Sequence, residues 1–127
     1  PVEVATQKRK KGDGAWSPAL TRTVDILSSV TSSEDRPAIV VGFAAETERV
    51  VEYATDKLHR KGLDAIVAND VGPGGAFGSD HNQVTVLTHD GRAIALGPAD
   101  KRSIADGIVQ AIAELTPRAA AAGQHAP

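Results

Sequence analysis

The feature that most constrains the fold is an uninterrupted apolar segment at residues 38–43, Ala-Ile-Val-Val-Gly-Phe, which follows the helix-breaking pair Arg36-Pro37. A strand with one face in water alternates polar and apolar residues, whereas a run without polar residues is typical of a strand covered on both faces. Such strands occur mainly in parallel sheets that have helices on both sides. The segment therefore predicts a central parallel strand in a protein that mixes helices and strands.

The rest of the chain alternates between helical and strand-like patterns of apolar residues. Gly62 is placed to end one helix, Asp90-Gly91 is a strong hairpin signal, and Asp100 is a suitable cap for the last helix. The expected elements, in chain order, are a strand at 16–20, a helix from a Thr23 cap to about 33, the strand at 38–43, a helix at 46–61, a strand at 63–68, a hairpin at 83–88 and 92–96, and a helix at about 100–115.

This order favours an α/β fold with a mostly parallel sheet, flanking helices and an antiparallel edge hairpin. In such sheets, ligands bind in the crevice beyond the carboxyl ends of the strands. Here those ends fall at residues 21–25, 43–46 and 69–70. The sequence therefore predicts a ligand site near these three segments.

A length of 127 residues is consistent with one domain or part of one. The chain has no cysteine, which excludes disulfides, thiolate metal ligands and a cysteine nucleophile. It has no apolar stretch long enough to span a membrane and no secretion signal, so a cytoplasmic protein is expected. The four histidines show none of the spacings typical of a metal site, so no metal ligand is assigned.

Basic residues gather near the beginning of the chain, where Lys8-Arg9-Lys10-Lys11 precede Gly12 and Gly14. Residues 1–15 are therefore expected to form a mobile basic loop that closes over an anionic ligand. A solvated charged loop and an arm that binds nucleic acid are the alternatives. Residues 1–12 carry a net charge of +3 and the whole chain −2, so the remainder is acidic, with a net charge of −5.

Phe43 and two lysines are candidates for contacts with a nucleotide. Phe43 ends the apolar strand, where it either contacts a base or packs in the core. Lys57 and Lys61 are one helical turn apart, where like charges repel unless an anion lies between them; an ordinary solvated helix face is the alternative. A helix that begins at Glu46 would carry Lys57 about 16 Å from the crevice.

Several sequence blocks together resemble the phosphopantothenate-cysteine ligase domain of coenzyme A biosynthesis. They occur in the family's order and extend the resemblance from Pro1 to about Ala113. The blocks are Lys8-Arg9-Lys10-Lys11, Val24-Asp25-Ile26-Leu27, Val41-Gly42-Phe43-Ala44-Ala45-Glu46-Thr47, Lys57 with Lys61-Gly62-Leu63-Asp64, Ala68-Asn69-Asp70-Val71, and Phe77-Gly78-Ser79-Asp80-His81-Asn82.

The resemblance implies a Rossmann-like, dimeric enzyme that joins 4'-phosphopantothenate to cysteine. Bacterial members of the family typically use CTP with Mg²⁺ to convert the carboxylate of phosphopantothenate to an acyl-cytidylate, with loss of pyrophosphate. The cysteine amine then displaces CMP. FMN is implied only if a flavin-dependent decarboxylase domain precedes the chain, and no membrane or nucleic-acid partner is implied.

The family's functional residues map onto this chain at matching positions. Lys8 matches a lysine that acts on the phosphate and the intermediate, so it is the expected catalytic residue. The resemblance also implies nucleotide contacts at Lys8, Val24, Asp25, Ile26, Leu27, Phe43, Lys57 and Lys61. For residues 24–27, backbone N–H groups at the start of a helix favour anions.

The chain begins just after the point where the family's glycine-rich first half ends. Residues 1–116 are therefore expected to be the C-terminal half of a ligase domain, inactive alone, and residues 117–127 a disordered tail. The alternative function is a noncatalytic α/β module that binds nucleic acid through its basic N-terminal arm. The acidic remainder of the chain and the shortage of aromatic residues for base stacking count against that alternative.

Overall fold

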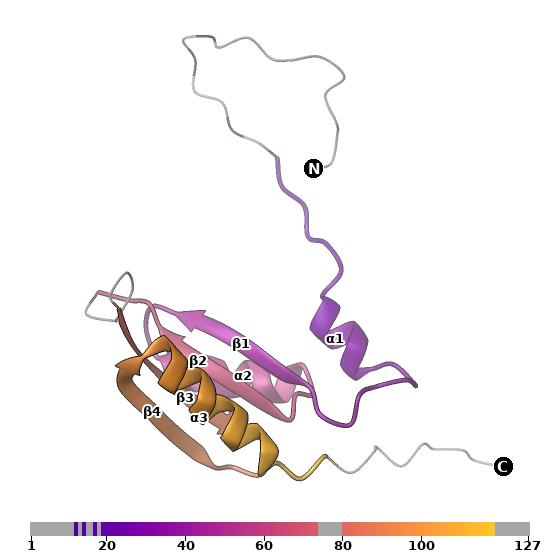
Figure 1. Ribbon diagram of the computed structural model, residues 1–127. Helices are drawn as coiled ribbons and strands as arrows, with labels where there is room; N and C mark the ends of the chain where they lie inside the picture. Colours follow the sequence, from indigo (N-terminus) through magenta and orange to yellow (C-terminus); the bar gives the residue numbers. More distant parts are fainter. Residues whose placement is uncertain (1–11, 13, 15–16, 18, 74–79, 119–127) are drawn as a thin grey trace, which may run out of the picture.

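The computed structural model describes residues 12, 14, 17, 19–73 and 80–118. Within this part, helices and strands alternate and then end in a hairpin and a helix (Figure 1). The elements are α1 (Ile26–Thr31), β1 (Val41–Glu46), α2 (Val50–Arg60), β2 (Ala65–Asp70), β3 (His81–Thr88), β4 (Ala93–Asp100) and α3 (Lys101–Ala113).

The four described strands form one sheet in the order β1-β2-β3-β4, so the expected α/β class is confirmed. The expectation of a mostly parallel sheet is wrong for this part of the chain, because only β1 and β2 are parallel. A parallel pair needs a crossover connection, which α2 supplies between β1 and β2. The described chain has no helix between β2 and β3, and β3 pairs antiparallel with β2.

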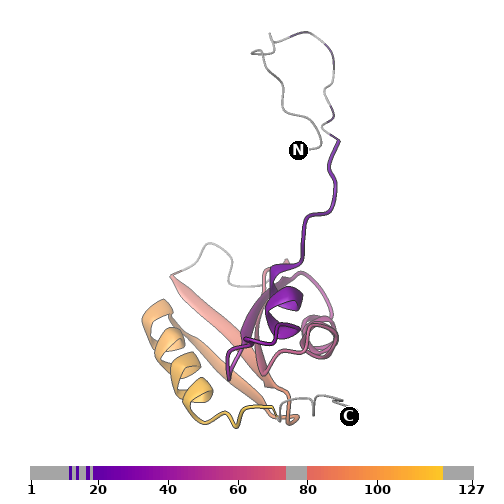
Figure 2. The same ribbon diagram turned by 90° about the vertical axis from the view of Figure 1, so that its right-hand side faces the viewer.

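The helices cover opposite faces of the sheet, with α1 and α2 on one side and α3 on the other (Figure 2). Ile66 and Ala68 of β2 pack with Leu58 of α2, whereas Ala65 and Val67 pack with residues of α3. Strand β2 is therefore buried on both faces. The prediction of a central parallel strand at 38–43 is confirmed in part. Strand β1 begins at Val41 and pairs parallel with β2, but it lies at the edge of the described sheet, so the central position is wrong for this part of the chain.

Local signals at the ends of the elements predict the structure well. Gly62 and Gly91 have positive φ angles of 64° and 90°, which suit the end of α2 and the hairpin turn, and Asp100 caps α3 through the N–H groups of Arg102 and Ser103. The cap of α1 is Asp25, and not the expected Thr23. Ser17, Ala19 and Leu20 are not in a strand; Trp16 and Pro18, in the rest of that expected strand, lie outside the described residues.

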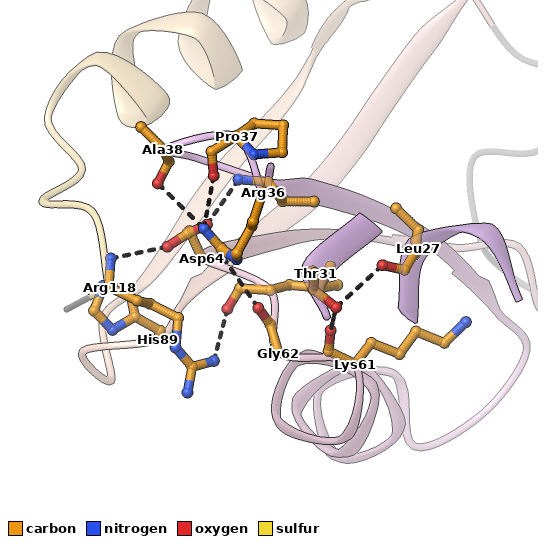
Figure 3. Close-up of polar contacts among 12 residues, drawn as sticks. Leu27, Thr31, Arg36, Pro37, Ala38, Lys61, Gly62, Asp64, His89 and Arg118 are labelled. Atoms are coloured by element: carbon orange, nitrogen blue, oxygen red, sulfur yellow. Dashed lines mark hydrogen bonds and ion pairs between the residues drawn. The ribbon is translucent and has the colours of Figure 1, made fainter. Parts of the chain in front are cut away.

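The carboxylate of Asp64, which is fully buried, joins three separate segments of the chain (Figure 3). Its Oδ2 atom accepts hydrogen bonds from Arg36 Nη2 (2.6 Å) and from the backbone N–H of Val40 (2.7 Å). Its Oδ1 atom accepts one from the backbone N–H of Arg118 (3.0 Å), whose Nη1 atom also donates to the Leu63 carbonyl. Arg118, part of the expected tail, is thus bound to the core, and residues 119–127 lie outside the described part.

Burial acts to raise the pKa of Asp64, but the N–H groups of Val40 and Arg118 and the guanidinium of Arg36 outweigh it, so the pKa lies below its ordinary value of 3.8. The folded state thus holds this group charged more strongly than the unfolded state does. Its contribution to stability is present above pH 3.8 and is lost as the pH falls through the lower pKa of the folded state.

We expect Asp64→Ala to lower the free energy of unfolding by about 3–5 kcal/mol, the usual cost of removing one partner from a buried ion pair. Urea denaturation followed by circular dichroism measures this loss. Asp56→Ala is the matched control, because Asp56 pairs with Arg60 at 3.7 Å on an exposed helix face and should contribute less than about 1 kcal/mol. Equal losses for the two variants would contradict the role assigned to Asp64.

Candidate functional site

The carboxyl ends of β1 and β2 lie side by side and are joined through their loops. The N–H of Val71 donates to the Glu46 carbonyl at 2.9 Å, and the N–H of Gly72 donates to Asp70 Oδ1 at 2.9 Å. A Cβ atom at Gly72 would lie only 2.2 Å from the Thr47 carbonyl oxygen. Position 72 thus requires glycine, and the loop after β2 packs directly against the loop after β1.

The structure brings together residues 24–27 and Lys61, which are far apart in the sequence. Asp25 caps α1 by accepting from the Ser28 N–H, and its Oδ2 atom pairs with Lys61 Nζ at 3.0 Å. Thr31 Oγ1 donates to the Lys61 carbonyl at 2.6 Å (Figure 3). Both ends of α1 therefore contact the end of α2. Leu27 packs against the core, while Val24 and Ile26 remain exposed.

Lys57 contacts the end of β1, contrary to the separation expected from the sequence. Its Nζ atom lies 2.5 Å from Glu46 Oε1, and the Glu46 side chain is only 13% exposed. The expected distance of about 16 Å assumed that the helix begins at Glu46. Instead β1 includes Glu46 and α2 begins at Val50, and the two long side chains span the remaining distance.

Phe43 occupies a different position from the one predicted. It lies inside β1 and not at its end, and its side chain is 72% exposed and not packed in the core. Gly42 next to it lies close to Leu63, Leu27 and Ile66, on the α2 side of the sheet. Since neighbouring residues of a strand point to opposite faces, Phe43 faces the side that carries α3. The two lysines and Phe43 are therefore on opposite faces of the sheet, at its β1 edge.

Lys8, the expected catalytic residue, lies outside the described residues, as do most residues of the basic loop. Within the described part, no three His, Asp or Glu side chains are grouped in a way that could hold a metal ion, so these residues offer no magnesium site. No helix in that part combines the length and apolar composition needed to cross a membrane.

Sequence reasoning did not assign a role to Glu46 or Asn69. Both belong to the blocks that carry the family resemblance, and both lie near the carboxyl ends of the parallel pair, where a ligand is expected. The available signal was their position, since an acidic and an amide residue stand at the ends of two apolar runs, where ligands bind in such sheets.

A family model described as "DNA/pantothenate metabolism flavoprotein C-terminal domain" matches residues 1–115. Relatives named coenzyme A biosynthesis bifunctional protein CoaBC include one from Bacillus subtilis, 44% identical over 117 residues, which are 91% of this chain and 29% of the relative. Another, from Haemophilus influenzae, is 41% identical over 113 residues, or 89% of this chain and 28% of the relative. The chain spans less than a third of the length of these curated relatives.

A similar fold has been solved for the C-terminal domain of a coenzyme A biosynthesis bifunctional protein CoaBC. Its crystal structure superposes with a TM-score of 0.61 and 40% sequence identity, covering 74% of this chain and 42% of the solved chain. At this identity, the likeness covers sequence as well as fold.

The Lys61 side chain and the Ser28 N–H together lower the pKa of Asp25 from 3.8 to about 2. The pairing therefore stabilises the folded state above pH 3.8, and its contribution is lost as the pH falls towards 2. We expect an NMR titration of the Asp25 carboxyl to give a pKa of about 2, and Lys61→Met to raise that pKa towards 3.8. Lys57→Met, which removes a lysine bound to Glu46 instead, should leave the Asp25 pKa unchanged; an equal rise in both variants would show that Lys61 has no specific effect.

Proposed function

Because this chain belongs to the family of DNA/pantothenate metabolism flavoprotein C-terminal domains, we propose that it is the nucleotide-binding half of a phosphopantothenate-cysteine ligase. The proposal takes the described sheet as one half of a Rossmann-like sheet, whose other half is the glycine-rich part of the ligase domain. The ligase acts in coenzyme A biosynthesis on 4'-phosphopantothenate, cysteine and CTP, as a homodimer.

The observation that supports this function best is the contact between residues 24–27 and Lys61. The family resemblance implies nucleotide contacts for both, although they are more than thirty residues apart in the sequence. In the fold, Asp25 and Lys61 are 3.0 Å apart, and Lys57 lies one helical turn from Lys61 on α2. A polyanionic ligand has two cations available along this helix, each held by a carboxylate with which the ligand would compete.

In the proposed reaction, the carboxylate of 4'-phosphopantothenate attacks the α-phosphorus of CTP. The bond from that phosphorus to the pyrophosphate oxygen breaks, which gives an acyl-cytidylate and pyrophosphate. The cysteine amine then attacks the acyl carbon, CMP leaves, and an amide forms with loss of the amine proton. The ammonium of Lys8 would offset the negative charge that develops on the phosphate. Mg²⁺ accompanies the triphosphate, and no step is assigned to a metal held by the described residues.

Pyrophosphate release tests this function. We expect the 127-residue chain alone to release none from CTP, 4'-phosphopantothenate and cysteine, because the proposal places part of the triphosphate site in the other half of the domain. Supplying that half from the Bacillus subtilis relative, fused to the chain or as a second polypeptide, should restore CTP-dependent pyrophosphate release. A folded assembly that remains inactive, or full activity from the chain alone, would overturn the proposal.

Lys8→Gln in the active assembly tests the catalytic role proposed for Lys8. Turnover should fall at least ~100-fold, the scale for losing one electrostatic stabiliser of a transition state. The unfolding temperature should stay unchanged. Near-normal turnover would remove Lys8 from the catalytic role.

We expect Phe43→Ala to weaken CTP binding about tenfold, within the ~1–3 kcal/mol that stacking of one base contributes. Because Phe43 is 72% exposed in this chain, its truncation removes little buried surface within the chain and should not unfold it. Lys57→Met and Lys61→Met should also weaken binding, with a reduced dependence on salt. Val109→Ala, another exposed apolar side chain (66% exposed, on α3), is the matched control and should bind CTP normally. Isothermal titration calorimetry of the assembly measures all four affinities.

A further inference from the structure

Asn69 carries an orphaned polar atom in the part of the chain that the structure describes. Its Oδ1 atom is buried and has no hydrogen-bond partner, the only such side-chain atom among the described residues. The neighbouring Asp70 differs, because its Oδ1 atom accepts from the Gly72 N–H. A buried amide oxygen without a donor has lost its hydrogen bonds to water and has not replaced them. A ligand that donates a hydrogen bond to this atom would therefore be stabilised.

The position of Asn69 in the sheet shows where such a partner could bind. Asn69 is next to last in β2, with Ala45 of β1 and Val84 of β3 as its register partners. Ala65 and Val67, which point to the same face, belong to the core under α3. Asn69 therefore shares its face with Phe43 and Ala45 of β1.

That face is open over β1. Helix α3 packs against β3 and β4, while Phe43 and Ala45 are both exposed. The register partners of Asn69 on β1 and β3 are an alanine and a valine, whose side chains have no hydrogen to donate. Among the described residues, the sheet neighbours of Asn69 therefore supply no donor for its Oδ1 atom, and a molecule on the exposed surface formed by Phe43 and Ala45 is placed to supply one.

We propose that Asn69 Oδ1 accepts a hydrogen bond from an amino group of a substrate that lies against Phe43. This inference rests on the proposed ligase function, under which Phe43 contacts the nucleotide. Two of the proposed substrates carry an amino group, namely the cytosine ring of CTP and cysteine. The chemistry on the protein side is the same for both, a buried amide oxygen that accepts a hydrogen bond. If the donor is the cytosine amino group, Asn69 distinguishes CTP from UTP, which has a carbonyl oxygen at that position and would face the Asn69 oxygen unfavourably.

Asn69→Leu in the active assembly tests the proposal, since leucine has a similar volume but no acceptor. We expect KM for CTP or for cysteine to rise at least tenfold, while the unfolding temperature stays the same or rises, because the variant removes an unpaired buried polar atom. A loss of the preference for CTP over UTP assigns the donor to the base. An increase in KM for cysteine with the nucleotide preference intact assigns it to the cysteine amine.

Asn69→Asp keeps an acceptor at this position and should hold the affected KM within threefold of the wild-type value. It serves as the test if Asn69→Leu does not fold. Asn82→Leu is the matched control: Asn82 Oδ1 already accepts from the Gln83 N–H, so this variant should lower the unfolding temperature and leave both KM values unchanged.

Unchanged KM values in Asn69→Leu, or an Asn69→Asp variant as impaired as the leucine variant, would overturn the inference. Either result would leave the proposed ligase function standing, because each variant is compared with a wild-type assembly that releases pyrophosphate from CTP. An inactive wild-type assembly would instead overturn the proposed function itself.

Discussion

The buried carboxylate of Asp64 is the interaction on which the arrangement of the other elements depends. It accepts hydrogen bonds from the segment that enters β1 and from the segment that leaves α3, and it lies itself directly before β2. The Asp64 N–H in turn donates to the Val40 carbonyl at 2.9 Å, which aligns β1 and β2 at their first residues. With that register established, Phe43 and Ala45 face one side of the sheet and Glu46 faces the other.

The features that follow from short-range chemistry were predictable from the sequence. The hairpin at Asp90-Gly91, the glycine after α2 and the Asp100 cap each depend on a few neighbouring residues. The place of β1 was not predictable, because strand order depends on partners distant in the sequence. The same apolar run that suggested a central strand belongs to an edge strand here, with Phe43 exposed. For the site, the sequence indicated Lys57, Lys61 and Asp25 but not the ion pairs Lys57–Glu46 and Lys61–Asp25, since those pairs form only when separate elements pack.

Lys57 and Lys61, at the C-terminal end of α2, are both held in ion pairs. Each is bound to a carboxylate from a different element, Lys57 to Glu46 of β1 and Lys61 to Asp25 at the start of α1. The pairs restrain flexible side chains that would otherwise lose more conformational entropy on binding a ligand. An anionic ligand would therefore compete with these two carboxylates for the ammonium groups.

The hydrogen bond from Arg118 to Asp64 joins residues that are 54 positions apart in the sequence. Leu115 is buried in the core just before it, and the Thr116 carbonyl contacts the His89 ring at 2.9 Å. A ribosome delivers the chain from its N-terminus, so β1 and β2 emerge well before the residues that complete the set of donors around Asp64. Until residues 115–118 have left the exit tunnel, the Asp64 carboxylate lacks the hydrogen bond from the Arg118 N–H. Among the described residues, this short segment is therefore the last to reach the sheet during synthesis.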